Sequence, residues 1–295
     1  MKRKVYVIGN VYMALKMELD HLPRRGENIS GVDIAHSPSG KGLVEAISSS
    51  FYGAETYILA SIGVGAFGNH ILDKLNQYNV NTKYIKRVEK HTGINVVMMS
   101  KGDIEQIISE GANNDINEED ISRFLEDAKE GDVLISSLEL PMITVKYAIS
   151  LAKQKGLKII LNPVPLDLRI TDVLYDIDYL ILNEKEYKDL TNESINITNA
   201  SIKVDGLNTI VTMGEKGVYW IDNDLTFDAI EPEKAIDDRR ALDFFIGSFA
   251  SMVAQDKETT YSIAFARTVA SLSTHVLGFK KALKPIKEVE EKFLS

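Results

Sequence analysis

The sequence predicts an α/β fold in which a mostly parallel β-sheet carries helices on both faces. Short apolar runs rich in valine, isoleucine and tyrosine recur along the chain, as is typical of strands that are buried on both sides. Segments with a helical hydrophobic period lie between these runs, and the alternation indicates parallel strands joined by helical crossovers. The 295 residues are enough for one large domain with a small appendage.

The expected elements follow from these patterns in chain order. The expected strands are the apolar runs at 5–9, 56–62, 94–100, 132–137, 158–163, 179–184, 209–214 and 218–222. The expected helices are the periodic segments at 42–53, 67–78, 118–131, 143–156, 241–255, 259–277 and 285–294.

Two segments, 11–37 and 90–110, break the alternation, and we expect them to form a small antiparallel β lid. The second segment is a pair of extended stretches around the turn SKGD. The main α/β domain then comprises 1–10, 38–89 and 111–295. Because ligands of open α/β sheets bind at the carboxyl ends of the strands, such a lid would cover the ligand site.

The composition excludes several classes of site and partner. Cysteine is absent, which excludes disulfides, thiolate metal sites and cysteine nucleophiles. The five histidines lack the close spacing of a histidine metal site. A net charge of −9 argues against nucleic acid or an anionic membrane as a partner, because both need a basic surface. Gly9 and Asn10 interrupt the first apolar run, and no stretch approaches a membrane span, so we expect a cytoplasmic protein.

The segment GVGAFG at 63–68 matches the glycine pattern of a dinucleotide-binding turn. It follows an expected strand, and Glu89 lies about twenty residues further on, where that motif has its ribose-binding acid. The strand is not the first of the chain, however, and no expected strand ends at Glu89. We favour a plain glycine turn between strand and helix, and a nicotinamide dinucleotide stays open as an alternative.

Two short segments suit anionic or polar ligands. Gly40, Lys41 and Gly42 precede a helix, whose free N–H groups suit an anion or a sugar hydroxyl. A tight turn with a solvated lysine explains the same residues equally well. Asn183 and Glu186 follow a strand, where an acid can hold a hydrated Mg²⁺ near phosphates. A helix-capping pair explains them without any ligand.

Two glycines and one carboxylate complete the candidate residues. Gly214 and Gly217 lie between two expected strands, where they allow the backbone to approach a ligand or simply form a hairpin. Asp243 lies in the first turn of an expected helix, where the helix dipole favours its charged form. Such a carboxylate suits a base that accepts a hydroxyl proton, and an ordinary acid at a helix start is the alternative.

The order of these motifs resembles the ribokinase (PfkB) family of sugar and nucleoside kinases. The series is SGKG, TG at 92–93, EGAN at 110–113, NEKE, TMGEKG and a helix start with two acids, and the resemblance runs from residue 4 to about residue 290. It implies a ribokinase-like, Rossmann-like α/β fold with a β lid through which homodimers form. It also implies transfer of the γ-phosphoryl group of ATP, with Mg²⁺, to a hydroxymethyl group of a small-molecule acceptor such as a sugar.

The resemblance assigns roles residue by residue. Asp243 matches the catalytic base, and Asp237 matches the first acid of the family's D-T-x-G-A-G-D signature. The positions that match nucleotide and Mg²⁺ binding are Thr212, Gly214, Gly217, Asn183 and Glu186, of which Glu186 acts on the metal through water. The positions that match acceptor binding are Gly40, Lys41, Gly42 and Asn113.

The departures from the family pattern concern both substrates. The G-A-G of the signature reads Arg240-Ala241-Leu242, so side chains stand where glycine N–H groups would close on the transferred phosphoryl group. Arg240 can offer its guanidinium to a phosphate instead. The polar positions that would recognise a sugar are apolar or aromatic here, at Tyr12, Ala14, Val44 and Val64. The alanine-rich wall near the adenine is replaced by Arg267, Thr268 and Val269.

Two hypotheses for the function remain at this point, besides the dinucleotide alternative. The first is an active kinase with an atypical acceptor site and an altered anion hole, in which Asp243 is the base and Arg240 contributes to catalysis. The second is a catalytically weak or inactive relative that acts as a ligand-binding or regulatory protein. The retained acids favour the first hypothesis, and the joint loss of the glycines and the sugar-binding residues favours the second.

Overall fold

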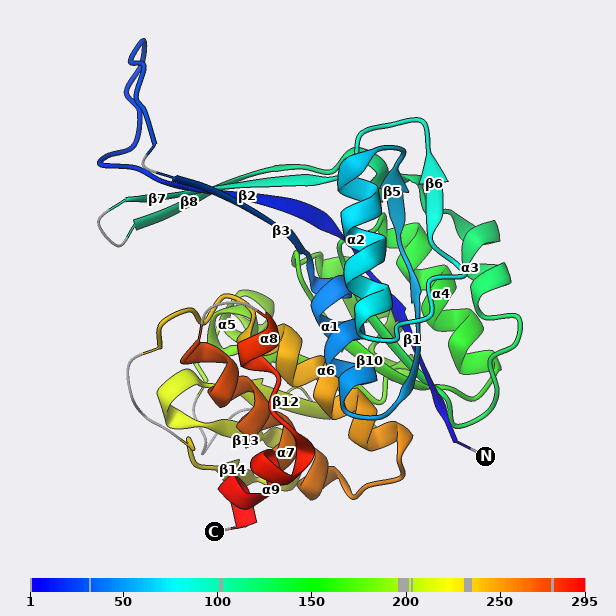
Figure 1. Ribbon diagram of the computed structural model, residues 1–295. Coiled ribbons are helices and arrows are strands. Elements are labelled where there is room, and N and C mark those ends of the chain that lie inside the picture. Colours follow the sequence, from blue (N-terminus) through cyan, green and yellow to red (C-terminus); the bar gives the residue numbers. More distant parts are fainter. Residues whose placement is uncertain are drawn as a thin grey trace.

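The computed structural model describes residues 2–31, 33–100, 103–195, 202, 204–230, 235–276 and 279–294. Its centre is an eight-stranded sheet (Figure 1). In spatial order its strands are β14 (Leu225–Phe227), β13 (Val218–Trp220), β12 (Asn208–Thr212), β11 (Tyr179–Asn183), β10 (Lys158–Asn162), β9 (Val133–Ser137), β1 (Lys4–Ile8) and β4 (Glu55–Leu59). The pairs from β12 to β4 are parallel, and β13 and β14 pair antiparallel at one edge. The predicted mostly parallel sheet is therefore confirmed.

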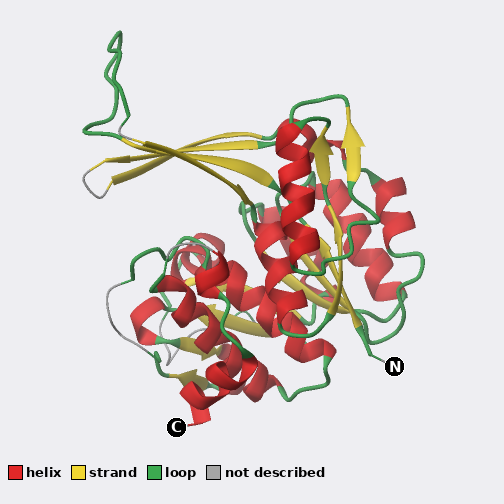
Figure 2. Cartoon of the chain, viewed as in Figure 1, coloured by secondary structure: helices red, strands yellow, loops and turns green. Residues whose placement is uncertain are grey.

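Helices cover both faces of this sheet (Figure 2). The first face carries α1 (Lys41–Phe51), α2 (Ala66–Gln77), α6 (Ala241–Ala254), α7 (Thr259–Thr274), α8 (Phe279–Ala282) and α9 (Ile286–Leu294). The second carries α3 (Glu118–Phe124), α4 (Met142–Gln154), η2 (Leu168–Asp176) and α5 (Glu184–Thr191). Alternate residues of each strand point to opposite faces, so Val5 and Val7 join one buried cluster, and Tyr6 and Ile8 join the other.

Two expected elements differ in the structure. The expected strand 56–62 divides into β4 and β5 (Ser61–Gly63), and β5 pairs with β6 (Lys86–Val88) outside the main sheet. The strand expected at 94–100 lies in the lid, within the expected lid segment 90–110. The helix expected over 118–131 ends at Phe124, because the chain then turns and packs Leu125 and Ala128 into the second cluster. Residue 277, at the end of the expected helix 259–277, lies outside the described residues.

The two segments that break the alternation contribute the strands of one separate sheet. In spatial order it contains β3 (Asp33–Ser39), β2 (Tyr12–Glu18), β7 (Ile94–Ser100) and β8 (Asp103–Ser109), and it projects from the α/β body (Figure 1). The sheet is mixed and not purely antiparallel, because β2 pairs parallel with β7. Strand β3 also continues to Ser39, beyond the expected lid segment 11–37. Residues 101 and 102 of the expected SKGD turn lie outside the described residues.

The pairing register of the lid determines which side chains share its inner face. Lys16 of β2 is paired with Val97 of β7, and Val97 is paired with Gln106 of β8. Two residues along the strands, Ala14 is paired with Asn95. Residues paired directly across strands lie on one face, and so do residues two apart along a strand. The inner face therefore combines Lys16 and Ala14 with polar and apolar residues of β7 and β8.

The described residues contain no helix that is long and apolar enough to cross a lipid bilayer.

Helices α1 and α6 cross with their backbones in close contact. A Cβ atom placed on Gly247 of α6 would lie 2.4 Å from the backbone oxygen of Glu45 in α1. No real carbon approaches an oxygen that closely, so any larger residue at 247 would push the two helices apart. Gly247 thus determines how near the start of α6 lies to the start of α1.

We predict that Gly247→Ala lowers the free energy of unfolding by about 1–3 kcal/mol, as overpacking of a well-filled core does. The measurement is urea unfolding followed by circular dichroism. Ser150→Thr adds one methyl group to an exposed residue of α4 and serves as the control, with an expected change within about 0.5 kcal/mol. Equal effects of the two substitutions would show that the α1–α6 contact is not close-packed.

Candidate active site

Polar residues gather where the parallel strands end. Glu139, Asn162 and Asn183 lie at or just after the carboxyl ends of β9, β10 and β11. Asn10 follows β1, and Thr212 ends β12. Carboxyl ends of parallel strands meet at one edge of a sheet, which is where open α/β sheets bind their ligands. This edge is therefore the candidate site.

The start of helix α6 carries the central carboxylate of the site. Asp243 lies in the first turn, is 6% exposed, and its Oδ1 accepts a hydrogen bond of 3.3 Å from Lys41 Nζ. Lys41 is the first residue of α1, so the close contact of the two helices brings the pair together. Burial by itself lowers the pKa of Lys41. The neighbouring Asp243, Glu45 and Glu139 together raise it by more, so the pKa of Lys41 lies above its usual value. Lys41 is therefore a permanent cation beside Asp243.

Two cavities flank the start of α6. The lid cavity, of about 190 Å³, lies between the inner face of the lid and the body, and its lining includes Tyr12, Ala14, Gly40, Lys41, Val44, Glu139, Arg240 and Asp243. The hairpin cavity, of about 220 Å³, has a lining that includes Thr212, Gly214, Gly217, Ala241, Leu242 and Arg267. The side chains of Arg240 and Asp243 therefore face the lid cavity, whereas Leu242 faces the hairpin cavity.

A hydrogen-bonded cluster surrounds Tyr12 and Glu139, two residues that line the lid cavity. The Tyr12 hydroxyl donates to Glu110 Oε2 at 2.6 Å, and Asn10 Nδ2 donates to both groups, at 3.0 Å and 3.1 Å. The backbone N–H of Asn10 donates to Glu139 Oε2 at 3.3 Å. Tyr12 thus provides a hydroxyl where the sequence comparison had indicated only an aromatic replacement. No site role was expected from the sequence for Asn10, Glu110 or Glu139. The available signals were the EGAN motif, which begins at Glu110, and the position of Glu139 shortly after a strand.

Asn113 does not line the lid cavity. Its Oδ1 accepts from the backbone N–H of Val11 at 3.1 Å, and its Nδ2 donates to the carbonyl of Val11 at 3.0 Å. The amide therefore holds the backbone next to Tyr12. In the structure Asn113 positions this backbone, and the direct acceptor contact that the resemblance implied stays a prediction.

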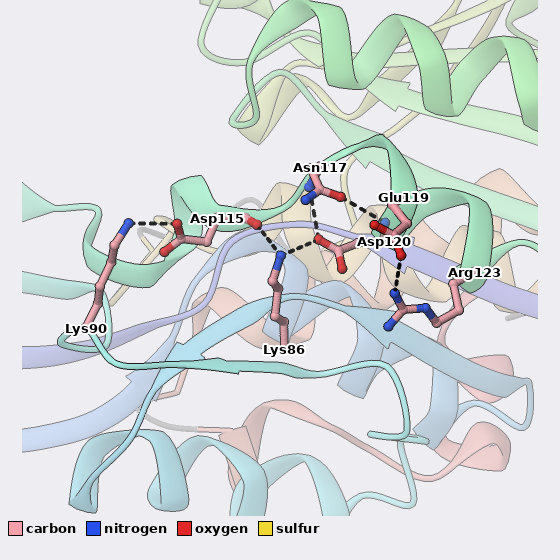
Figure 3. Close-up of polar contacts among 7 residues, drawn as sticks. All are labelled: Lys86, Lys90, Asp115, Asn117, Glu119, Asp120 and Arg123. Carbon is pink, nitrogen blue, oxygen red and sulfur yellow. Dashed lines mark hydrogen bonds and ion pairs between the residues drawn. The ribbon is translucent and has the colours of Figure 1, made fainter.

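A salt-bridge network anchors η1 (Gly111–Asp115), the short helix that carries Asn113 (Figure 3). Lys86 Nζ donates to the carbonyl of Asp115 at 2.7 Å and to Asp120 Oδ2 at 2.6 Å. Lys90 Nζ pairs with Asp115 Oδ1 at 2.7 Å. Strand β6 and the chain after it are thereby tied to η1 and α3, which fixes the wall behind Tyr12.

Asn183 and Glu186 form the helix cap that the sequence offered as one alternative. Asn183 Oδ1 accepts from the Glu186 N–H at 2.9 Å, and Glu186 Oε2 accepts from the Asn183 N–H at 3.0 Å. Asn162 Nδ2 also donates to Glu186 Oε2 at 3.1 Å, and Asn162 Oδ1 is buried with no hydrogen-bond partner among the described residues. Burial raises the pKa of Glu186 despite these hydrogen bonds. The cap therefore leaves one oxygen, that of Asn162, in need of a donor.

The two glycines of the β12–β13 turn, Gly214 and Gly217, have different structural surroundings. Gly214 has a φ of 56° and open space around it, whereas a Cβ on Gly217 would lie 2.0 Å from the Phe227 carbonyl. Gly217 is thus required by the β13–β14 packing, and Gly214 borders the hairpin cavity.

The glycines at the start of α1 allow close backbone contact. A Cβ on Gly40 would lie 2.4 Å from the Asn10 carbonyl, and one on Gly42 would lie 2.7 Å from the Gly9 carbonyl carbon. Gly40 and Gly42 let α1 start directly against the end of β1.

The GVGAFG turn is explained by backbone packing. A Cβ on Gly63 would lie 2.0 Å from the Lys90 carbonyl, and one on Gly68 would lie 2.3 Å from the Gly63 carbonyl. Val64 in this turn is 48% exposed and lines neither cavity. These contacts account for Gly63 and Gly68, and a φ of 134° accounts for Gly65, all without a dinucleotide.

Arg267 is the residue of the altered α7 segment that reaches the hairpin cavity. Its Nη1 donates to the Asp228 carbonyl, and burial lowers the pKa of its guanidinium. Thr268 and Val269 are buried instead: the Thr268 hydroxyl donates to the Ala264 carbonyl, and Val269 joins the first core cluster. Only Arg267 of these three residues therefore changes the wall of the cavity.

Two further carboxyl groups lie near the Lys41–Asp243 pair. Glu45 of α1 is 1% exposed, and neither of its oxygens has a hydrogen-bond partner among the described residues. Burial, with a contribution from Asp243, raises the pKa of Glu45 well above its usual value. Burial likewise raises the pKa of Glu139 to about 7, against the opposing effect of Lys41. The sequence contained a signal for Glu45, which was an acid within the apolar face of a helix.

The architecture is the ribokinase-like α/β fold. A solved Arabidopsis thaliana ribokinase complexed with ribose and ATP is similar, with a TM-score of 0.85, 24% identity and 99% of each chain covered. The family model of the pfkB carbohydrate kinases matches residues 2–284, so this chain belongs to that family. It is 29% identical to a deoxyribokinase of Salmonella typhi, with 97% of each chain covered. It is 28% identical to a ribokinase of Bacillus subtilis, with 98% of this chain and 99% of that protein covered.

We predict that Glu139 makes stability fall as pH rises from about 4.5 to about 7. Between its usual pKa of 4.5 and its folded pKa of about 7, Glu139 keeps its proton when folded and loses it when unfolded. In this range the unfolded chain binds fewer protons than the folded protein. Rising pH therefore favours unfolding, and the free energy of unfolding falls by about 3 kcal/mol in total. Urea unfolding at several pH values should show this loss in the wild type and a flatter profile in Glu139→Gln. Glu291→Gln, at an exposed position of α9, is the control, and parallel curves for wild type and Glu139→Gln would contradict the prediction.

Proposed function

We propose that this protein is an ATP-dependent kinase that transfers a phosphoryl group to a hydroxymethyl group of a sugar or related small molecule. The observation that carries the proposal is the position of Asp243. Its carboxylate lies at the start of α6, faces the lid cavity, and adjoins the residues that line the hairpin cavity. A base at the junction of two cavities suits a reaction between two bound molecules.

In this proposal the acceptor occupies the lid cavity and ATP occupies the hairpin cavity. Asp243 accepts the proton of the acceptor's hydroxyl group. The oxygen of that hydroxyl group then forms a bond to the γ-phosphorus of ATP. The bond from that phosphorus to the bridging oxygen breaks, and ADP leaves. The free N–H groups and the dipole at the start of α6 stabilise the negative charge of the transferred group. Lys41 holds Asp243 in place through its hydrogen bond to Oδ1.

The residues present fit a hydrated Mg²⁺ ion near the phosphates. Asn162 Oδ1 needs a donor such as a metal-bound water, and the adjacent carboxylate of Glu186 supplies negative charge. No group of three or more metal-ligating side chains was found among the described residues, which agrees with contact through water. When bound, the ion would offset the charge of the ATP phosphates.

A catalytically weak or inactive relative is the alternative, and Leu242 favours it. Its side chain lines the hairpin cavity and packs against the first core cluster, at a position where the family has glycine. A side chain there keeps the phosphates away from the backbone N–H groups of the loop. In that case the protein would use its lid cavity to bind a ligand without turning ATP over.

We also propose that two copies pair through the outer face of the lid. Ile34 and Ile107 lie on this face and are 57% and 60% exposed. Exposed isoleucines on a projecting sheet are costly in water and suit a second, identical sheet.

We predict that Asp243→Asn lowers kcat by about 10²–10⁴, because the amide accepts no proton. The measurement is ATP consumption with a panel of sugars, sugar phosphates and nucleosides. MgATP binding should persist in the variant, because Asp243 faces the lid cavity. Asp172→Asn removes an exposed carboxylate that pairs with Lys146 and is the control.

Thermal unfolding with MgATP, together with the assay of ATP consumption, distinguishes an active kinase from an inactive ligand-binding protein. At one hundred times its dissociation constant, a ligand stabilises the native state by about 2.7 kcal/mol. Stabilisation together with turnover supports the kinase. If MgATP has no effect at several millimolar, or no acceptor accelerates ATP consumption, the kinase proposal fails and the binding protein stands.

We predict that Ile107→Asp converts a dimer into a monomer, because a charge on the outer face of the lid cannot be buried unpaired. Light scattering after gel filtration measures the mass. Ile143→Asp, at an exposed position of α4, is the control and should leave the mass unchanged. A wild type that is monomeric at all concentrations would contradict the pairing.

A further inference from the structure

The lining of the lid cavity contains more cationic side chains than carboxylates. Its lining includes four cationic side chains, of Lys16, Lys41, Arg239 and Arg240, and two carboxylates, of Glu139 and Asp243. Asp243 is paired with Lys41. Burial raises the pKa of Glu139 to about 7, so this group carries only part of a negative charge near neutral pH.

Lys16 is the clearest part of this surplus. It lies on β2, on the inner face of the lid, and the described residues offer its ammonium group no hydrogen bond or ion pair. Arg239, in contrast, pairs with both oxygens of Asp237, at 2.8 Å and 2.7 Å. The ammonium of Lys16 is thus the cation of the lid that a ligand can neutralise.

The cations weaken one another in the absence of a ligand. Burial and the neighbouring guanidinium groups of Arg240 and Arg239 lower the pKa of Lys16, against a smaller opposing effect of Asp237. Burial also lowers the pKa of Arg240. Placing like charges together away from water costs free energy, which a negative ligand between them would recover.

A buried amide oxygen next to these cations also needs a partner. Asn95 Oδ1 is buried with no hydrogen-bond partner among the described residues, while its Nδ2 donates to Gln106 Oε1 at 2.9 Å. Both residues line the lid cavity. A carbonyl oxygen accepts hydrogen bonds only, so the missing partner is a donor such as a hydroxyl group.

We infer that the acceptor carries an anionic group, a phosphate ester or a carboxylate, in addition to its hydroxyl groups, and that Lys16 and Arg240 bind it. This inference rests on the proposed function for the identity of the lid cavity as the acceptor site. Arginine and lysine bind phosphate and carboxylate through charge-assisted hydrogen bonds. Asn95 accepts from a hydroxyl of the same molecule. Lys16 is then a specificity-determining residue, separate from the base Asp243.

The test compares matched acceptors that each retain a free hydroxymethyl group. Fructose is the neutral probe, fructose 6-phosphate carries a phosphate, and gluconate carries a carboxylate. ATP consumption gives kcat and KM for each probe, and calorimetry without ATP gives binding. The variants are Lys16→Met, Lys16→Arg to restore the charge, and Arg25→Ala, which removes an exposed cation elsewhere in the lid segment as the control.

The expected result is a lower KM for an anionic probe than for fructose, and the better anionic probe identifies the group as phosphate or carboxylate. Lys16→Met should raise that KM roughly tenfold to a hundredfold, the loss of one or two hydrogen bonds to a charged group, with little change for fructose. Lys16→Arg should recover most of the difference, and Arg25→Ala should change nothing.

Failure of the inference and failure of the kinase proposal give different results. If fructose is phosphorylated as well as the anionic probes, or Lys16→Met affects all probes equally, the inference is wrong and the kinase stands. If no probe is phosphorylated but an anionic probe binds and Lys16→Met abolishes that binding, the kinase proposal fails and the anion site stands. Absence of both turnover and anion binding overturns both.

Discussion

The buried ion pair between Lys41 and Asp243 is the interaction on which the candidate site depends. The two residues are 202 positions apart in the chain and meet because α1 and α6 pack with only a glycine, Gly247, between their backbones. Taking two charges out of water is costly, and such a pair forms only where the geometry and the neighbouring groups offset that cost. Glu45 and Glu139 supply this support, since both raise the pKa of Lys41.

The two cavities that flank the start of α6 have different structural origins. The hairpin cavity is built entirely by the α/β body, from the β12–β13 turn, helices α6 and α7 and residues of the segment between β14 and α6. The lid cavity needs the second sheet, because β2, β7 and β8 provide one of its walls. Changes on the inner face of the lid can therefore alter the acceptor without disturbing the opposite side of Asp243. Lys16 and Asn95 occupy that face.

Much of the fold was predictable because each parallel strand is a separate apolar run, and β9, β10 and β11 lie where their sequences indicated. The exceptions were elements whose partners are distant in sequence. The division of strand 56–62 into β4 and β5 depends on β5 pairing with β6, and the lid is mixed instead of antiparallel because β2 pairs parallel with β7. An apolar run does not specify which strand it will pair with.

The sequence by itself determined the class of the long periodic elements, the acid at the start of α6 and the glycines of the tight turns, because these depend on local periodicity and backbone conformation. The short elements β6, β14, η2 and α5 were not among the expected ones. The tertiary structure decided where the side chains of the altered loop point. Arg240 faces the lid cavity and Leu242 faces the hairpin cavity, while Asn113 binds backbone next to Tyr12. Side-chain direction follows from how the whole helix is docked, and that docking is set by contacts such as Gly247 against Glu45, far away in the sequence.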